Sequence, residues 1–176
     1  GRGGARLVIL GAGVAGVTAA EQARAVAASV AITLVSKEPG LPYYRLNLTR
    51  WLAGQVSDET LPLQPQRWYD EHHVELRHGE ASGIDRVRRT VLLRDGGSLP
   101  YDRLILATGA HPFVPPIAGA TRTGVLPLRT LEDARSLQTL ASRGTRVLVL
   151  GGGLLGLEAA GALAQRGALV TVLEGF

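Results

Sequence analysis

The sequence contains no cysteine, a single lysine (Lys37) among 19 basic residues, and no long apolar run. The absence of cysteine excludes disulfide bonds, thiolate metal sites and a redox-active dithiol. A membrane-spanning helix needs about 20 consecutive apolar residues, and residues 1–6 are too short for the apolar part of a signal peptide. We therefore expect a cytoplasmic protein without a membrane span.

The net charge of +4 raises the possibility of nucleic-acid binding. The arginines are scattered along the whole chain, however, and the densest group (Arg86, Arg88 and Arg89) alternates as on the solvent-exposed face of a strand. We therefore expect no nucleic-acid partner. The histidines have no ligand spacing with carboxylates, so we assign no metal site.

Two βαβ units are predicted, 140 residues apart. In the first, the short apolar runs Arg6–Leu10 and Ala31–Val35 predict strands, and the alanine-rich segment Val14–Ala28 predicts the helix between them. In the second, strands are expected at Thr145–Leu150 and Ala168–Leu173. They flank a glycine turn over Gly151–Gly156 and a helix over Leu157–Gln165.

The chain between these units is more varied. We expect an irregular insertion between Pro39 and Arg67 with a short helix over Leu46–Leu52, a helical turn over Trp68–His73, and a connector over His111–Pro127. Thr130 should cap a helix that continues to about Arg143. Strands are expected at Val74–Leu76, Ala81–Asp85, Thr90–Arg94 and Asp102–Ala107. Asp95-Gly96-Gly97 should supply the turn of the hairpin between the middle two.

These elements predict an α/β protein with a Rossmann-like dinucleotide-binding fold, in which a parallel sheet carries an inserted β-meander. We place one domain at residues 1–120 and the start of a second Rossmann unit at residues 121–176.

The first glycine fingerprint follows a strand and opens a helix. Gly11 permits a tight turn, Gly13 leaves space for a pyrophosphate, and Gly16 lets the helix approach the strand. The helix N-terminus offers free N–H groups to the phosphates, so the whole fingerprint is assigned to cofactor binding: Gly11, Ala12, Gly13, Val14, Ala15 and Gly16. Glu38, shortly after the next strand, is the candidate ribose ligand.

The second fingerprint has the same context, and its assigned residues are Gly151, Gly153, Leu154, Leu155 and Gly156. Glu174 stands at the end of the following strand, 23 residues after Gly151. A carboxylate there can accept hydrogen bonds from ribose hydroxyls and repels a 2′-phosphate. We therefore expect NADH rather than NADPH at this site.

Together, the two fingerprints, the intervening hairpin and the strand ending in Leu104-Ile-Leu-Ala-Thr-Gly-Ala110 resemble the FAD-dependent pyridine-nucleotide oxidoreductases. Two segments, Glu38–Arg50 and Gly151–Ala159, are similar to one branch in particular. That branch contains rubredoxin and ferredoxin reductases and the flavoprotein module of NAD(P)H-dependent nitrite reductase large subunits. The resemblance implies a Rossmann-like FAD/NAD(P)-binding fold, with FAD bound by the first domain and NAD(P)H by the second.

The resemblance implies further roles, carried over by motif. Arg45 lies in the branch-specific segment, and Ala81 would present backbone groups to the adenine of FAD. The remaining implied FAD contacts are Ala107, Thr108, Gly109 and Arg129. Arg50 takes the place of a lysine near the flavin and Glu158 matches a glutamate near the nicotinamide, so an Arg50–Glu158 pair is expected as the catalytic pair. A solvent-exposed role remains open for both residues.

The implied activity is hydride transfer from NADH to FAD, followed by electron transfer to an acceptor protein or domain, such as a nitrite reductase module, rubredoxin or ferredoxin. Because the fold of the resembled family is longer, the chain is expected to be a fragment with an exposed sheet edge, and a homodimer is possible. The alternatives are an FAD- or NAD-binding regulatory or scaffold module without turnover, and a Rossmann dehydrogenase with one cofactor. The second fingerprint argues against the latter.

Overall fold

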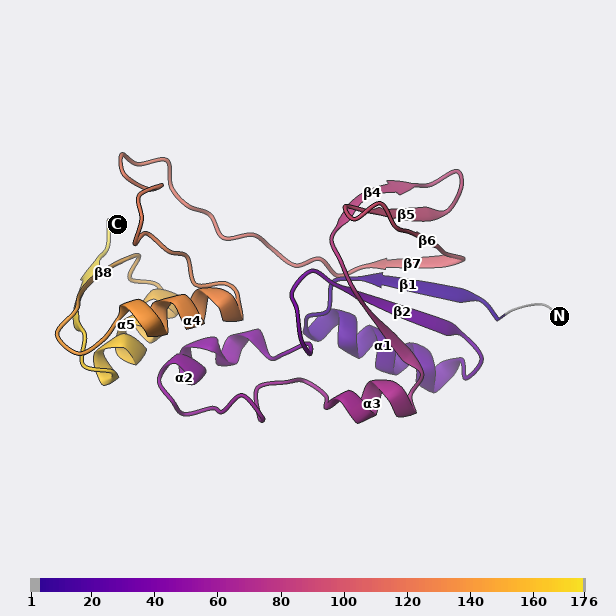
Figure 1. Ribbon diagram of the computed structural model, residues 1–176, viewed down its shortest axis with the longest axis horizontal. Coiled ribbons are helices and arrows are strands. Elements are labelled where there is room, and N and C mark those ends of the chain that lie inside the picture. Colours follow the sequence, from indigo (N-terminus) through magenta and orange to yellow (C-terminus); the bar gives the residue numbers. More distant parts are fainter. Residues whose placement is uncertain (1–3, 176) are drawn as a thin grey trace. The chain divides into compact units, whose positions relative to one another are not determined.

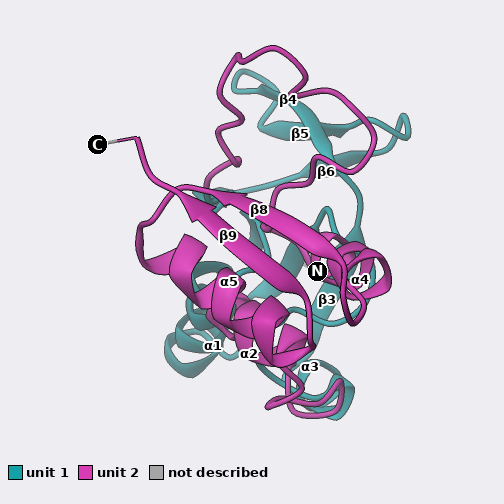
Figure 2. Ribbon diagram, turned by 90° about the vertical axis from the view of Figure 1, so that its left-hand side faces the viewer, with its two compact units in different colours: residues 1–44, 62–109 teal, residues 45–61, 110–176 magenta. Residues whose placement is uncertain are grey.

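The computed structural model describes residues 4–175 and divides the chain into two compact units. Unit 1 comprises residues 1–44 and 62–109, and unit 2 comprises residues 45–61 and 110–176 (Figure 2). The segment 45–61 therefore belongs with the C-terminal part of the chain, although its neighbours in sequence belong to unit 1. The predicted division at residue 120 concerns cofactor domains and stays a prediction.

Unit 1 is built on a parallel sheet of four strands in the order β3-β2-β1-β7 (Figure 1). The strands are β1 (Arg6–Leu10), β2 (Ala31–Ser36), β3 (Val74–His78) and β7 (Arg103–Leu106). Helix α1 (Val14–Val26) connects β1 to β2, which are parallel neighbours, so the first predicted βαβ unit is confirmed. All the carboxyl ends of these strands lie at one edge of the sheet, where ligands bind in open α/β folds.

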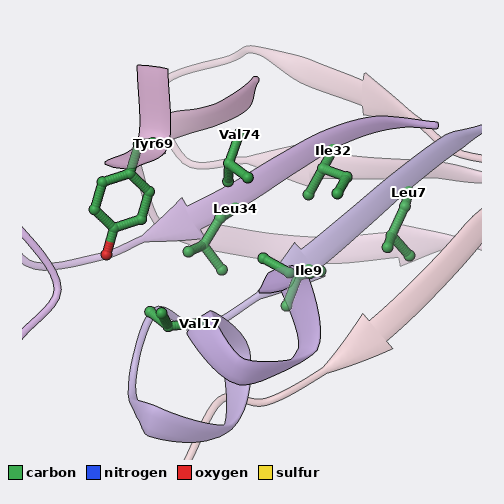
Figure 3. Packing of buried hydrophobic residues seen from close by; sticks show 8 residues of the cluster. Leu7, Ile9, Val17, Ile32, Leu34, Tyr69 and Val74 are labelled. Atoms are coloured by element: carbon green, nitrogen blue, oxygen red, sulfur yellow. The ribbon is translucent and has the colours of Figure 1, made fainter. Parts of the chain in front are cut away.

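Both faces of this sheet are covered, which explains the nearly continuous apolar runs of β1 and β2. Leu7, Ile9, Ile32 and Leu34 point to the face that packs against α1 and Tyr69 (Figure 3). The alternate side chains form a second cluster with the antiparallel strands: Val8, Leu10, Val35, Val91, Leu93 and Tyr101. Burial raises the pKa of Tyr69 to about 12, because the ionised phenol loses its hydration.

In the second cluster, the parallel sheet packs against a three-stranded antiparallel meander. Its strands are β4 (Ala81–Asp85), β5 (Thr90–Leu93) and β6 (Ser98–Pro100). The sequence did not reveal β6, a strand of three residues that ends in a proline. The predicted hairpin assignment was also wrong, because Asp95–Gly97 joins β5 to β6 and residues 86–89 join β4 to β5. Arg86, Arg88 and Arg89 accordingly lie in a turn and not on a strand, and Arg89 has a positive φ of 50°.

Helix α3 (Gln66–Glu71) leads into the edge strand β3. Arg24, near the end of α1, links α1 to the segment between α3 and β3. Its guanidinium donates to the carbonyl oxygens of His72 (2.8 Å) and His73 (3.0 Å), and also to those of Ala27 and Ala28. One side chain therefore binds backbone carbonyls at the ends of two helices, where a helix leaves carbonyls without intrahelical partners.

Unit 2 contains the second βαβ unit, in which β8 (Arg146–Leu150) and β9 (Leu169–Leu173) are parallel neighbours joined by α5 (Leu154–Gln165). Helix α5 begins three residues before the predicted start at Leu157, because Gly153 and not Gly156 is its N-cap. A short 3-10 turn η1 (Arg45–Asn47) continues into α2 (Leu48–Leu52), and α2 packs against α4 (Leu131–Leu140) and α5.

The predicted cap of α4 is confirmed. Thr130 accepts a hydrogen bond from the N–H of Asp133 at 3.1 Å, and the Asp133 carboxylate accepts one from the N–H of Thr130 at 2.8 Å. This reciprocal pair satisfies two donors that the helix itself leaves free. None of the helices between residues 4 and 175 is long and apolar enough to cross a membrane.

Within residues 4–175, helix α5 packs on one face of the β8–β9 sheet, and the other face has no cover. Val147, Val149 and Val170 are half-buried on the covered face. The alternate residues are exposed large apolar side chains: Leu148, Leu150, Leu169 and Leu173. A parallel pair normally has both faces covered, so this sheet presents an uncovered apolar face.

Candidate functional site

The first glycine fingerprint forms the turn between β1 and α1 at the carboxyl edge of the unit 1 sheet. The N–H of Gly11 donates to the carbonyl of Val35 at 3.0 Å, which ties the turn to the end of β2. Helix α1 begins at Val14 with Gly13 as its N-cap, and no side chain caps this end. Its first N–H groups and the positive end of its dipole are therefore available to an anion.

The three glycines of this turn are required for different reasons. A Cβ on Gly11 would overlap the carbonyl oxygen of Ala107, and its φ of +103° is unfavourable for other residues. A Cβ on Gly16 would overlap the carbonyl oxygen of Gly11 and lie 3.3 Å from the Cδ1 of Leu34. Gly11 and Gly16 are therefore required by the conformation and packing of the protein itself.

Gly13 has neither requirement. Its φ of −80° and ψ of −170° are accessible to any residue, and a Cβ placed there has no atom within 4 Å. The space in front of Gly13 is therefore open, at the point where the helix N-terminus faces outward. This is the geometry that a pyrophosphate close to the backbone requires.

The segment Ala107–Gly109 lies directly beside this turn. The N–H of Ala107 donates to the carbonyl of Leu10 at 2.7 Å, and the Ala107 carbonyl faces Gly11. Thr108 and Gly109 follow as exposed residues, and Gly109 has a φ of 69°. The structure thus brings the Ala-Thr-Gly element to the first fingerprint, across about 95 residues of sequence.

Glu38 lies at the same edge and is half-buried. Its carboxylate accepts a hydrogen bond from the Tyr43 hydroxyl at 2.5 Å, and its carbonyl accepts one from the Ser36 hydroxyl at 2.8 Å. These contacts hold the Glu38 backbone close to the end of β2.

Lys37 points away from this group and pairs with Glu80. The Lys37 Nζ and the Arg94 Nε each lie 3.0 Å from a Glu80 carboxylate oxygen. The hydrogen bond from Lys37, together with the charge of Arg94, lowers the pKa of Glu80. Ala81 follows Glu80 at the start of β4, pairs with Leu93, and is half-buried.

The second fingerprint repeats the first in unit 2. The N–H of Gly151 donates to the carbonyl of Leu173 at 2.8 Å, as Gly11 donates to Val35. Gly151 has a φ of +108°, and a Cβ on Gly156 would overlap the Gly151 carbonyl oxygen. Gly153, with a φ of −69° and a ψ of 175°, again has open space in place of a Cβ.

The acidic residue at the second turn is held against the glycines. The N–H of Gly152 donates to the Glu174 carboxylate, and a Cβ on Gly152 would lie 3.2 Å from the Cβ of Glu174. Leu154 and Leu155 start α5 with exposed side chains, Leu154 at 77%. The predicted residues of the second site therefore lie together around one open turn.

The two turns differ in the residue that follows the second strand. Since Val35 and Leu173 accept the equivalent hydrogen bonds, Ser36 occupies the position at the first site that Glu174 occupies at the second. Glu38, the predicted ribose ligand, lies two residues farther along. Ser36 is buried, and its hydroxyl is engaged by the Glu38 carbonyl.

Two arginines assigned to FAD lie together in unit 2. The Arg45 guanidinium donates to the carbonyl of Arg129, and the Arg129 Nε donates to the carbonyl of Ala110 at 3.1 Å. The Arg129 N–H is bonded in turn to the Asp133 carboxylate at 2.9 Å. The start of α4 therefore positions Arg129.

The expected Arg50–Glu158 pair is not formed. Within residues 4–175, the Arg50 guanidinium contacts the Asn47 side chain at 3.5 Å. The Glu158 carboxylate instead accepts a hydrogen bond from the Thr49 hydroxyl at 3.1 Å. The reason is geometric: α2 turns its buried face, which includes Thr49, toward its neighbouring helices, and this leaves Arg50 on the exposed side.

Comparison with known proteins agrees with this arrangement. Residues 5–176 match the family described as pyridine nucleotide-disulphide oxidoreductase. The chain belongs to this family. Rhodocoxin reductase of Rhodococcus erythropolis is 41% identical over 96% of this chain, and the NADH nitrite reductase large subunit of Escherichia coli K12 is 37% identical over 96%.

Solved structures give the same result for the fold. The reductase in a covalent putidaredoxin reductase–putidaredoxin complex matches 96% of the chain with a TM-score of 0.86 and 35% identity. A ferredoxin reductase of Rhodopseudomonas palustris matches 95% with a TM-score of 0.88 and 32% identity. The Rossmann-like α/β fold is confirmed.

The chain covers only part of these family members. It spans 40% of rhodocoxin reductase, 20% of the nitrite reductase subunit and 42% of each of the two solved reductase chains. Membership of the pyridine nucleotide-disulphide oxidoreductase family implies binding of FAD and of NAD(P)H. The disulphide chemistry in the family's name has no counterpart among these residues, because the sequence has no cysteine.

The sequence did not reveal three features of the site in this family member. Thr49, Ser36 and Tyr43 make the hydrogen bonds that hold Glu158 and Glu38. The sequence carries one signal of the Thr49 contact: Thr49 lies on the apolar face of a short helix, and a buried hydroxyl needs a hydrogen-bond partner. No group of three or more potential metal ligands is found among residues 4–175.

Proposed function

We propose that this chain supplies the FAD-binding elements and the start of the NADH-binding domain of an FAD-dependent NADH oxidoreductase. In this proposal, electrons leave to an acceptor protein or domain. The names of the relatives support it, because they include rhodocoxin reductase, rubredoxin-NAD(+) reductase and nitrite reductase large subunits.

One observation carries the proposal. Each of the two turns contains a glycine, Gly13 or Gly153, that neither the backbone conformation nor the packing of the protein requires. Both lie at uncapped helix N-termini, where N–H groups and the helix dipole favour phosphate. A ligand that approaches the backbone closely accounts for a glycine at both positions, and two such turns suit two dinucleotides.

At the first site, the N–H groups at the start of α1 would bind the FAD pyrophosphate. The exposed Thr108 and Gly109, held beside Gly11 by β7, would line the same cofactor. Glu38 and Ala81 are the residues proposed to meet the adenosine half. The family resemblance further implies that Arg45 and Arg129 contact the flavin nucleotide and that Arg50 is a cation near the flavin.

At the second site, the start of α5 would bind the NADH pyrophosphate. Gly152 holds Glu174 at the turn, where its negative charge would accept hydrogen bonds from ribose and repel a 2′-phosphate. Glu158, in the same helix, is proposed to face the nicotinamide. The bound cofactors supply hydride and electron transfer, whereas the protein supplies binding, orientation and local charge.

The experiment is anaerobic titration of the complete, FAD-loaded protein with NADH, followed by flavin absorbance. We expect NADH to bleach the flavin bands, and NADPH to do so only at much higher concentration. An electron acceptor should then restore the bands, and a ferredoxin, a rubredoxin and nitrite can be compared as acceptors. A protein that contains FAD but is not bleached by either nucleotide would contradict the enzyme proposal and support a binding module without turnover.

A homodimer remains part of the proposal. Among the described residues of this chain, Leu148, Leu150, Leu169 and Leu173 of the β8–β9 sheet expose apolar surface, which supports self-association of this chain. Size-exclusion chromatography with light scattering tests it on this chain. A monomer at all concentrations would rule the dimer out while leaving the cofactor proposal intact.

A further inference from the structure

The contact between Thr49 and Glu158 links the short helix α2 to the helix that follows the second fingerprint. Thr49 is only 5% exposed, and its hydroxyl donates to the Oε2 of Glu158 at 3.1 Å. The two residues are 109 positions apart in sequence but belong to the same unit. A buried hydroxyl without a partner is costly, so the bond to Glu158 stabilises the packed position of Thr49.

The bond uses one side of the carboxylate only. Among residues 4–175, no hydrogen bond or ion pair to the Oε1 of Glu158 is found. Glu158 is the fifth residue of α5, and its side chain is exposed. Thr49 thus fixes one carboxylate oxygen and leaves the other free to accept a hydrogen bond from a ligand.

Among the residues that the structure describes, no cation forms an ion pair with this carboxylate. Arg50, the neighbouring residue on α2, contacts the Asn47 side chain. Arg166, the C-cap residue of α5, donates to the carbonyl of Leu52 at 3.4 Å and so makes a separate contact between the end of α5 and α2. The orientation of Glu158 therefore depends on a neutral donor, which holds the carboxylate without neutralising its charge.

We propose that Thr49 is a positioning residue for the nicotinamide site: through its bond to Oε2 it orients Glu158, so that Oε1 accepts a hydrogen bond from the carboxamide N–H₂ of a reduced nicotinamide. The inference rests on the proposed function. It assigns to Thr49 an effect on nicotinamide binding and hydride transfer without direct contact with the substrate. Such orientation matters because small misplacements of a reacting group cost large factors in rate.

The test compares Thr49→Val and Thr49→Ser in the complete, FAD-loaded protein. Valine keeps the shape of threonine and removes the donor, whereas serine keeps the donor. Stopped-flow flavin reduction by NADH gives the Kd and the limiting rate separately. We expect T49V to lower the ratio of the limiting rate to Kd about tenfold, which is the size expected for the loss of one hydrogen bond to a charged group. In T49S the same ratio should stay within about twofold of wild type.

A double-mutant cycle with Glu158→Ala, which removes the acceptor of the Thr49 hydroxyl, separates positioning from structural support. If Thr49 acts through Glu158, T49V should have little further effect in the E158A background. Gln55→Leu is the matched control, because Gln55, three residues after the end of α2, also bonds to α5, at Gln165 (3.4 Å), seven residues along the helix from Glu158. Q55L should leave the reduction kinetics unchanged.

Two outcomes would overturn the positioning role. T49S could lose as much activity as T49V, or T49V could retain its full effect in the E158A background. NAD⁺ affinity, measured by calorimetry, is an independent readout and should follow the same order. If the wild-type protein neither binds NAD⁺ nor is reduced by NADH, the proposed function fails first, and the role of Thr49 fails with it.

Discussion

A pair of alanine substitutions in the first glycine turn separates the needs of the fold from those of the cofactor. At Gly16, the new Cβ would overlap the Gly11 carbonyl oxygen and press on Leu34. Gly11 cannot retreat easily, because its N–H is bonded to Val35 and its other side faces Ala107. At Gly13, the new Cβ would have no atom within 4 Å.

The expected magnitudes differ accordingly. Overpacking of a tight contact costs about 1–3 kcal/mol or more, so Gly16→Ala should lower the free energy of unfolding by at least that amount. Gly13→Ala gains about 0.4–1 kcal/mol from the stiffer unfolded chain and loses roughly 0.5–1 kcal/mol at the N-cap, where glycine is preferred to alanine. The free energy of unfolding of G13A should therefore lie within about 1 kcal/mol of wild type.

Cofactor affinity should show the opposite pattern. A methyl group at Gly13 occupies the space proposed for the FAD pyrophosphate and keeps it from the backbone N–H groups. Loss of a hydrogen bond to a charged group costs about 1.5–3 kcal/mol, which corresponds to a roughly 10- to 150-fold weaker Kd.

The assays are urea unfolding of the cofactor-free complete protein and an FAD titration followed by flavin fluorescence. The reasoning is refuted if G13A unfolds as early as G16A, since the turn would then need glycine there for its own packing. It is equally refuted if G13A unfolds normally and binds FAD within about twofold of wild type.

Three further predictions follow. Glu174→Gln should narrow the preference for NADH over NADPH roughly tenfold in flavin-reduction kinetics, because the repulsion of a 2′-phosphate is lost; an unchanged ratio would contradict the ribose role. Arg24→Met should lower the free energy of unfolding in urea by about 1–3 kcal/mol, because its hydrogen bonds to backbone carbonyls are lost. Arg103→Met is the control and should be near neutral, because the Arg103 guanidinium donates to the carbonyl of the adjacent Asp102. The hydrogen bonds from Arg6 lower the pKa of Asp102. The resulting stabilisation of the fold is therefore present above the unfolded pKa of about 3.9 and is lost as pH falls through the folded pKa. Asp102→Asn should remove this contribution to the dependence of the unfolding free energy on pH below about 4, and an unchanged dependence would count against the bond.

Much of the fold was readable from local sequence pattern. The apolar runs at β1 and β2, the alanine-rich α1 and the Thr130–Asp133 cap were all predicted correctly, since each depends on neighbours within a turn or two. The start of α5 was misplaced for the opposite reason. Gly156 reads as a turn residue, but it is helical, and it is glycine because α5 passes close to Gly151.

The candidate site divides in the same way. The sequence by itself determined where the two nucleotide turns lie, because a glycine turn between a strand and a helix is a local feature. Only the tertiary structure decided which glycines the protein needs for itself and which remain open to a ligand. It also placed Thr49, and not Arg50, on Glu158. Side chains 109 residues apart meet through the packing of α2 on α5, and sequence spacing carries no information about which faces of two helices come together.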